Sequence, residues 1–492
     1  MTRAEPDIVI IGSGIGGATV AAGLADTGAR IVILERGYRI PDDAPARDPW
    51  RIYTNSAFRS EETWLDADDQ PFEPGNYYNV GGNSKLYGAV LIRYRAEDFA
   101  EMHHAEGISP AWPFGYDVLA PWYDRAEALF RVRGTRDDPT EPPHGPYPFA
   151  PVPDEPAIAQ VRARLNRAGV TAFTLPLGVD IDRWLAAGST GWDGYPDTRC
   201  GKMDAETCSL AFALERANVC LEEGAEVLSL NIGTDNRRVA EVVYRQNGET
   251  RILRPGTVIL AAGAVQSAAL LLRSGIANSA DQVGRCFMNH NASALIAIDP
   301  RFRNDAVYQK TFGINDWYLG DGAGGPPLGN VQALGRVTPD ILKIQVPQLP
   351  RPVARWISHH AVDLYAISED LPDPDSRVTV RGGKIKLAWR RSNMAAHRAL
   401  VSKTKATMRR AGFPIVLSRL FDGRVPSHQC GTCRMGDDPA RSVIDPDGRS
   451  WDHPNLWITD AAALPTSAAV NPALTVAALA LRAADTIAKE LP

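Results

Sequence analysis

Cysteine is scarce in this sequence, and long apolar runs are missing from it. The 492 residues include six cysteines, Cys200, Cys208, Cys220, Cys286, Cys430 and Cys433. Six are too few for a disulfide framework in so long a chain, so we expect free thiols in a reducing compartment. No stretch of roughly 18 apolar residues occurs, and no signal-peptide hydrophobic region precedes the first predicted strand. We therefore expect a cytoplasmic location and no membrane partner.

The chain also lacks an excess of positive charge. Its 53 Lys and Arg residues face 58 Asp and Glu residues, and the formal net charge is −5 at pH 7. Because nucleic-acid binding needs a dense basic surface, we expect no nucleic-acid partner. Cys430 and Cys433 form a C-x-x-C spacing, but no second cysteine pair stands at the spacing of a zinc site. We expect no bound metal.

What the sequence does carry begins with DIVIIGSGIGGATVAAGLADTGARIVILERG, residues 7–37. A β-branched run predicts a buried parallel strand, and a glycine loop and an Ala-rich helix follow it. Gly12 permits a tight turn, Gly14 lets the backbone approach a pyrophosphate, and Gly17 lets the helix pack close to the strand. A second predicted strand ends in Glu35, whose carboxylate would accept hydrogen bonds from ribose hydroxyls. The pattern predicts an adenine dinucleotide and leaves NAD and FAD open.

The length of the chain exceeds what one hydrophobic core usually supports, so we expect two domains. The first is a Rossmann-like α/β domain, discontinuous in sequence, because a predicted antiparallel meander at 238–260 ends in a strand that returns to its sheet. The second is an α+β domain with helices and a largely antiparallel sheet. Its predicted strands are 291–297, 331–337, 341–346, 361–368 and 377–387. A last helix is predicted from Ala473, directly after the first-turn proline Pro472.

Five separated segments resemble the glucose-methanol-choline flavoprotein oxidoreductases, in the order in which that family carries them. They are IGSGIGGATVAAGLADTG, VGGNSKLYGA, LAAGAVQSAALLLRSGI, SHQCGTCRMG and LWITDAAALPTSAAVNPALT. Two further stretches, VGRCFMNHN and EDLPDPDSRVTV, are similar to family segments as well. The resemblance runs from end to end of the chain and implies an FAD-dependent alcohol oxidoreductase.

The resemblance also implies which residues hold FAD. They are Gly12, Gly14, Gly17, Glu35, Arg36, Gly82, Asn83, Ser84, Val227, Gly263, Asp460, Ala461, Pro472 and Ala473. The last helix would direct its N-terminus at the flavin, where its dipole favours negative charge. On this basis we assign residues 1–40, 75–100, 200–290 and 425–492 to the FAD-binding domain, and residues 101–199 and 291–424 to the substrate-binding domain.

The family pairs a His in the segment matching SHQCGTCRMG with a His or Asn in the last segment, which implies His428 and Asn471 as the catalytic pair. A neutral imidazole is suited near pH 7 to take the hydroxyl proton while hydride leaves the carbon. The resemblance thus implies His428 as the base, Asn471 as the residue that holds the hydroxyl, and flavin N5 as the hydride acceptor. His290 is expected to shape a turn near the cofactor.

The implied substrate is a sugar or glycoside hydroxyl, because the His–Asn pair, GGNSKLYGA and VNPALT resemble the bacterial pyranose oxidase and glycoside 3-oxidase branch. The 6′ hydroxyl of an aminoglycoside precursor is an alternative, and a flavin-containing lyase without net redox is an alternative of another class. Trp184, Trp192 and Tyr195 could stack on a sugar. Some relatives attach FAD through a His at the position of Leu86, where leucine cannot form the bond, so we expect non-covalent FAD. Oxygen or another electron acceptor, and the oligomeric state, stay open.

Overall fold

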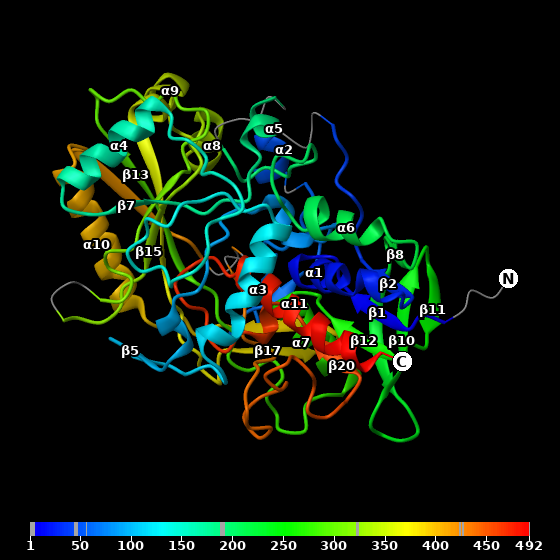
Figure 1. Ribbon diagram of the computed structural model, residues 1–492. Helices are drawn as coiled ribbons and strands as arrows, with labels where there is room; N and C mark the ends of the chain where they lie inside the picture. The colour runs from blue at the N-terminus through cyan, green and yellow to red at the C-terminus, as the bar shows by residue number, and fades with distance from the viewer. Residues whose placement is uncertain are drawn as a thin grey trace.

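The computed structural model describes residues 5–43, 48–55, 57–186, 192–320, 324–422, 425 and 428–491. Ser427, the first residue of the SHQCGTCRMG segment, lies outside the described residues. A parallel sheet and an antiparallel sheet dominate the fold, and in the view of Figure 1 they lie to either side of α3 (Tyr116–Leu129) and α11 (Ala473–Glu490). Both chain termini lie at the end that carries the parallel sheet (Figure 1).

The parallel sheet has five strands, in the order β20-β12-β1-β2-β8. Their bounds are β1 Ile8–Ile11, β2 Ile31–Leu34, β8 Val219–Glu222, β12 Thr257–Leu260 and β20 Leu456–Ile458. α1 (Ile15–Leu24) joins β1 to β2 and packs against α11. The strands come from four distant parts of the sequence, so the predicted discontinuous Rossmann-like sheet is confirmed.

Close approach of the backbone explains two of the glycines after β1. Gly12 has φ +99°, and a Cβ there would lie 2.4 Å from the carbonyl oxygen of Ala261. A Cβ on Gly17 would lie 2.0 Å from the carbonyl oxygen of Gly12. Any side chain at either position would collide with backbone, so only glycine lets α1 start this close to β1 and β12.

The predicted meander is present as the three-stranded antiparallel sheet β11-β10-β9. β9 spans Glu226–Ile232, β10 spans Val239–Gln246 and β11 spans Glu249–Leu253. β12 follows and leads into α7 (Ala264–Ser274), which packs against β9. Parallel strand, small-residue turn and helix therefore occur twice, after β1 and after β12.

The antiparallel sheet has six strands, in the order β19-β13-β16-β15-β14-β7. Their bounds are β7 Ala172–Thr174, β13 Asn291–Ile298, β14 Phe312–Ile314, β15 Asn330–Ala333, β16 Ala361–Ser368 and β19 Ile415–Leu420. One face packs against α4 (Pro156–Arg167) and α10 (Met394–Arg410), which lie on the outer side of the molecule in Figure 1. The other face is free to carry polar side chains toward the first domain.

Two strand predictions for this region are wrong. Residues 341–346 fall in the helix α8 (Pro339–Gln345), because Thr338 accepts a hydrogen bond from the backbone N–H of Ile341 (3.4 Å) and Pro339 occupies the first turn. That pair is a helix start, and it outweighs the β-branched composition of the segment. Residues 377–387 form a hairpin of β17 (Arg377–Arg381) and β18 (Lys384–Ala388) rather than one strand.

The remaining elements are short or peripheral. They are α2 (Pro49–Tyr53), β3 (Trp64–Leu65), β4 (Pro71–Phe72), β5 (Met102–His104), β6 (Gly107–Ser109), α5 (Ile181–Ala186), α6 (Ala211–Leu214) and α9 (Arg351–His360). Short 3-10 turns include η3 (Gly82–Leu86) and η6 (Ala461–Ala463). β3 and β4 extend the hairpin of β17 and β18 into a four-stranded sheet.

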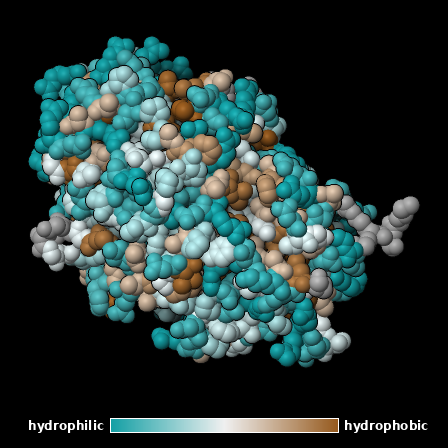
Figure 2. All heavy atoms as spheres, viewed as in Figure 1, coloured by the Kyte–Doolittle hydropathy of each residue, from teal (hydrophilic) through white to brown (hydrophobic). Residues whose placement is uncertain are grey.

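The surface is mixed in polarity. Hydrophilic residues cover most of the face shown in Figure 2, and hydrophobic residues lie between them in small groups. In the part of the chain that the structure describes, every helix is too short or too polar to cross a membrane.

Candidate active site

The loop between β1 and α1 forms an open cradle at the helix N-terminus. A Cβ added to Gly14 would meet no atom within 4 Å, whereas Gly12 and Gly17 are hemmed in by backbone. Gly82, in η3, approaches this loop so closely that its own Cβ would lie 3.2 Å from the Cα of Gly14. A phosphate group at Gly14 would meet unpaired backbone N–H groups of the first turn of α1 and its dipole. The cradle fits the pyrophosphate of a dinucleotide.

Glu35 lies at the end of β2, beside that cradle, as expected. Its side chain is 5% exposed, and its carboxylate accepts hydrogen bonds from the backbone N–H of Ser13 (3.0 Å), the hydroxyl of Ser13 (2.7 Å) and the backbone N–H of Gly37 (2.9 Å). Burial raises the pKa of this carboxyl, while these hydrogen bonds oppose the shift. Arg36 is held by ion pairs to Glu62 (2.9 Å) and Glu226 (3.4 Å). The carboxylate of Glu35 is thus fixed in place beside the cradle.

The VGGNSKLYGA segment is fastened to the same loop. The backbone N–H of Gly81 donates to the Ser13 hydroxyl (3.1 Å), and the hydroxyl of Ser84 accepts from the backbone N–H of Ala205 (3.1 Å). Asn83 is exposed, and its side-chain oxygen accepts from the backbone N–H of Tyr77 (3.0 Å). The segment therefore places backbone and small polar groups close to the cradle.

Asp460 joins the two Rossmann-type turns. Its carboxylate accepts from the backbone N–H groups of Gly263 (2.8 Å) and Ala462 (2.7 Å) and from the hydroxyl of Ser267. Burial raises the pKa of Asp460, and these three donors counteract that shift. Ala461 follows it in η6, and its carbonyl accepts from the backbone N–H of Gly431 (3.1 Å). The last two sequence motifs therefore run side by side.

The remaining implied cofactor residues lie on two elements. Pro472 caps α11 and Ala473 is its first residue, so the predicted start of this helix is confirmed to the residue. Val227 lies on β9, half-buried, where it packs against the large hydrophobic cluster of the first domain. α11 packs against α1, and β9 packs against α7, so both elements contact helices that follow strands of the parallel sheet.

His428 and Asn471 meet, although 43 positions separate them. The Nε2 atom of His428 lies 3.2 Å from the Nδ2 atom of Asn471. The side-chain oxygen of Asn471 accepts from the Nε2 atom of Gln332 on β15 (3.1 Å). On its other side, the Nδ1 atom of His428 lies 2.8 Å from the Nδ1 atom of His290, whose Nε2 atom lies 2.8 Å from the carbonyl oxygen of Ser467. Four side chains thus form one hydrogen-bonded chain.

The hydrogen-bond partners at the ends of this row of side chains determine which nitrogen atoms of His290 and His428 carry hydrogen. A carbonyl oxygen only accepts, so the Nε2 atom of His290 carries the hydrogen and its Nδ1 atom carries the lone pair. The Nδ1 atom of His428 must then donate to His290, which leaves the Nε2 atom of His428 as an acceptor for the amide N–H of Asn471. The lone pair of His428 Nε2 therefore points toward Asn471, where a general base would need it.

Burial keeps both imidazoles neutral. The pKa of His428 lies well below its usual value of 6.5, because the side chain is buried and because His290 and the Lys310 ammonium lie nearby. The pKa of His290 is lowered too, chiefly by burial. Lys310 itself is held by Asp193, 2.8 Å away. A neutral His428 is able to accept a proton, whereas an imidazolium is not.

The lowered pKa of His428 predicts the pH dependence of the enzyme. Because the base stays neutral down to a pH below 6.5, the acid limb of kcat/KM for flavin reduction is expected to fall below pH 6.5. An exposed imidazole would instead lose half of its activity at about pH 6.5. Anaerobic stopped-flow measurements of flavin reduction between pH 5 and 8 give this limb. An apparent pKa at or above 6.5 would contradict a buried, neutral base.

Sequence reasoning missed the roles of His290 and Gln332. His290 was expected to shape a turn near the cofactor; in addition it contacts His428, because Met288 and Cys430 pair in antiparallel fashion and their register sets His290 opposite His428. The backbone of His428 has φ +70°, a strained value for a non-glycine residue. Two histidines in family-like segments were the available signal, but the pairing of those segments is a tertiary feature. Gln332 carried no signal at all.

Trp184 and Tyr195 are not available to stack on a sugar. Their exposed fractions are 3% and 6%, and Trp184 packs edge-on against Tyr308. Trp192 is half-buried and donates through its indole N–H to the hydroxyl of Tyr53 (2.7 Å). These aromatic side chains serve packing in the described structure.

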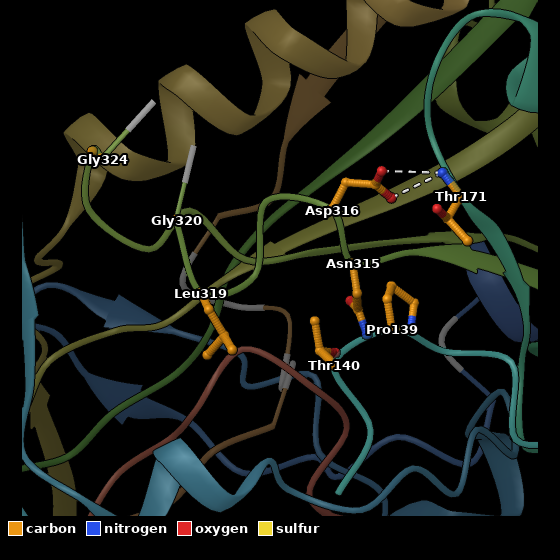
Figure 3. Close-up of a pocket in the computed structure, with 9 residues that line it drawn as sticks. Pro139, Thr140, Thr171, Asn315, Asp316, Leu319, Gly320 and Gly324 are labelled. Atoms are coloured by element: carbon orange, nitrogen blue, oxygen red, sulfur yellow. Dashed lines mark hydrogen bonds between the residues drawn. The ribbon is translucent and has the colours of Figure 1, made fainter. Parts of the chain in front are cut away.

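The cysteines, the possible metal ligands and the surface pockets do not form a second candidate site among the described residues. Cys430 and Cys433 are buried and free, and burial raises the pKa of both thiols. Among the described residues, no three His, Cys, Asp or Glu side chains are grouped to hold a metal ion. A surface pocket of about 590 Å³ lies beside Thr140, Asn315 and Asp316, and in Figure 3 the Asp316 carboxylate is engaged by the backbone N–H of Thr171 (3.0 and 3.1 Å). Neither His428 nor Asn471 lines that pocket.

Comparison with known proteins agrees with this geometry. The N-terminal family model of the GMC oxidoreductases matches residues 7–292, and the C-terminal model matches residues 373–480. Paromamine 6′-oxidase of Streptomyces fradiae is 29% identical over 99% of this chain and 92% of its own length. C-glycoside 3-oxidase of Microbacterium trichothecenolyticum is 30% identical, over 54% of this chain and 53% of its own.

A solved structure of pyridoxine 4-oxidase from Mesorbium loti shares the fold. It superposes with a TM-score of 0.64 at 20% identity and covers 98% of this chain and 99% of its own. The first family model alone spans more than half of this chain, and it includes the glycine cradle, Glu35 and the VGGNSKLYGA segment. The second includes His428 and Asn471. The chain therefore belongs to the GMC oxidoreductases, and it is an FAD-dependent enzyme that oxidises alcohols.

Proposed function

We propose that the protein oxidises a hydroxyl group of a sugar or glycoside to a carbonyl, with His428 as the base. The observation that carries the proposal is the chain from Ser467 through His290 to His428 and Asn471, which leaves the Nε2 lone pair of His428 directed at the amide of Asn471. A hydroxyl between those two groups would give its proton to Nε2 and accept a hydrogen bond from the Asn471 amide. A substrate of this type also fits the two oxidases reported above, which are named for glycosidic compounds.

Each residue of the site has a separate task in this mechanism. His428 removes the hydroxyl proton, which raises electron density on the oxygen and makes the carbon a better hydride donor. Asn471 orients the substrate oxygen. A hydrogen bond from Gln332 holds Asn471, and a hydrogen bond to His290 holds His428. FAD, when bound, supplies the hydride acceptor. Gln332 and His290 are buried, whereas His428 and Asn471 are half-buried and thus the members of the row that a substrate can reach.

We assign the cofactor to the cradle formed by Gly12, Gly14, Gly17, Gly82 and Glu35. Gly263, Asp460, Ala461, Asn83 and Ser84 are proposed to line it, with Val227 and Arg36 near the adenosine end and Pro472 and Ala473 near the flavin. The FAD-binding domain is proposed to consist of residues 1–40, 75–100, 200–290 and 425–492. These segments contain all five strands of the parallel sheet, and the segments 101–199 and 291–424 contain all six strands of the antiparallel sheet.

The experiment that tests the function is an anaerobic screen for flavin bleaching with pyranoses, glycosides and aminoglycosides, followed by identification of the product. Bleaching by a sugar or glycoside and a carbonyl product support the proposal. Product formed while the flavin stays oxidised throughout would indicate a lyase without net redox and would overturn it. Bleaching only by non-sugar alcohols would overturn the substrate class alone.

Oxidation of the 6′ hydroxyl of an aminoglycoside precursor is a second candidate. It is favoured by the similarity to paromamine 6′-oxidase, which extends over 99% of this chain. Regiochemistry of the product separates the two, because a 6′ aldehyde and a ring ketone differ in their NMR spectra and in their reaction with hydrazines.

FAD is proposed to bind without a covalent link to the protein. Leu86 ends η3, and its hydrocarbon side chain offers no nucleophile to the flavin. Acid precipitation of the purified holoprotein is expected to release all of the yellow colour into the supernatant. Flavin that stays with the precipitated protein, or a peptide carrying the mass of FAD, would contradict this prediction.

A further inference from the structure

Gln332 lies on the face of the antiparallel sheet that is turned away from α4 and α10. Its neighbours Val331 and Ala333 belong to the hydrophobic cluster under those two helices. Side chains alternate along a strand, so Gln332 points to the opposite face, where it meets Asn471. The antiparallel sheet thus places the Gln332 side chain beside Asn471.

The amide of Gln332 is only half satisfied. Its Nε2 atom donates to the side-chain oxygen of Asn471 (3.1 Å), but its Oε1 atom has no hydrogen-bond partner although the residue is 1% exposed. An unpaired buried acceptor costs free energy, on the order of 1–3 kcal/mol, and such groups are uncommon in folded proteins. This open acceptor belongs to the residue that holds Asn471, which in turn contacts His428.

Flipping the side-chain amide of Gln332 does not give its oxygen a hydrogen-bond partner. The Nδ2 atom of Asn471 faces the lone pair of His428, so the oxygen of Asn471 must face Gln332. Gln332 therefore has to present its N–H group to Asn471 and its oxygen to the other side. The tautomers of the two histidines thus determine the orientation of Gln332 as well.

The surroundings of Gln332 on this face are apolar. Gln332 pairs across the ladder with Tyr365, whose ring lies 5.7 Å from that of Phe421 at a tilt of 36°. Ala292 and Ile367 complete a small apolar cluster with Tyr365 on this face. The oxygen of Gln332 is thus a lone acceptor in apolar surroundings, where a missing donor is costly.

We propose that the Oε1 atom of Gln332 accepts a hydrogen bond from a second hydroxyl of the substrate, close to the carbinol that His428 deprotonates. The inference rests on the proposed function and narrows its substrate class to polyhydroxylated rings rather than simple alcohols. Gln332 then has two roles. It holds Asn471 through its N–H group, and it selects for a neighbouring hydroxyl through its oxygen.

The test compares a sugar that reduces the flavin with its monodeoxy analogues, in wild type, Gln332→Met and Gln332→Glu. In the wild type, one analogue that keeps the reacting hydroxyl is expected to lose roughly 10- to 150-fold in kcat/KM, because the buried acceptor stays unpaired. In Gln332→Met, which has no acceptor, that penalty is expected to fall to about 3-fold or less. In Gln332→Glu, which keeps an acceptor, the penalty is expected to remain.

The two variants control for each other. Both lose the amide N–H donor to Asn471, so both are expected to lower kcat for every substrate, and the comparison rests on the analogue penalty measured within each variant. FAD content and thermal unfolding of each variant report whether it folds. If wild-type enzyme accepts the parent sugar and every such analogue equally well, or if Gln332→Met keeps the full penalty, the inference is overturned while the proposed function stands. If no sugar bleaches the flavin, the proposed function fails and the inference falls with it.

Discussion

Replacing His428 with alanine is expected to slow flavin reduction by roughly 10²- to 10⁴-fold, the usual contribution of a general base. The Nε2 lone pair of His428 accepts the Asn471 amide N–H in the free enzyme and is proposed to take the hydroxyl proton once a substrate replaces that contact. Asn471 cannot take over this role, because an amide nitrogen has no usable lone pair. Stopped-flow reduction under anaerobic conditions measures the rate constant directly. FAD is expected to remain bound, because His428 lies outside the glycine cradle.

A matched control for this variant is His103→Ala. The side chain of His103 is 74% exposed, with only an ion pair to Glu101 at 3.4 Å, so its removal is expected to leave the rate constant unchanged. Flavin reduction in the His428→Ala variant at a rate close to that of the wild type would show that another group is the base. Loss of FAD from this variant would show instead that His428 has a structural role in the cofactor site.

Gly14→Ala is expected to weaken FAD binding on the order of 100-fold, or about 2.7 kcal/mol, with little effect on the stability of the apoprotein. A methyl group at Gly14 meets no protein atom within 4 Å, so the fold tolerates it. That open space is the part of the cradle that the pyrophosphate has to enter, so the methyl group displaces the ligand rather than the backbone. Flavin fluorescence during dialysis and thermal unfolding of the apoprotein measure the two quantities separately.

Two further glycine variants serve as controls for this prediction. Gly17→Ala is expected to destabilise the apoprotein itself, because its Cβ would lie 2.0 Å from the carbonyl oxygen of Gly12. Gly145→Ala, whose Cβ also meets no atom within 4 Å, lies outside the proposed cradle and is expected to change neither property. Unchanged FAD affinity in Gly14→Ala would show that the cofactor phosphates do not approach this residue.

Local signals sufficed for the cofactor domain. Gly12 and Gly17 allow backbone approaches that no other residue permits, and Pro472 starts α11, so these elements follow from short local patterns. The same kind of reasoning failed at 341–346. The apolar content of that segment predicted a strand, while the Thr338 cap and Pro339 started a helix.

The active site depends on contacts that no local pattern contains. His428 meets His290 because two segments pair in antiparallel register, and it meets Asn471 because the last two motifs run side by side. Gln332 reaches Asn471 from the middle of a sheet whose strand order does not follow the sequence. Each of these distances is set by how whole sheets pack, and sequence spacing carries no information about it.

By itself, the sequence determined the family and the Rossmann-like sheet, and it singled out His428 and Asn471 as a pair. Those features depend on short motifs in which residue type and spacing dictate backbone geometry and chemistry. Only the tertiary structure decided the protonation of that pair and the open acceptor beside it. Burial lowers the pKa of both histidines, and the carbonyl oxygen of Ser467 fixes their tautomers from the far end of the chain. Desolvation and hydrogen-bond direction arise from distant segments brought together, so they exist only in the folded molecule.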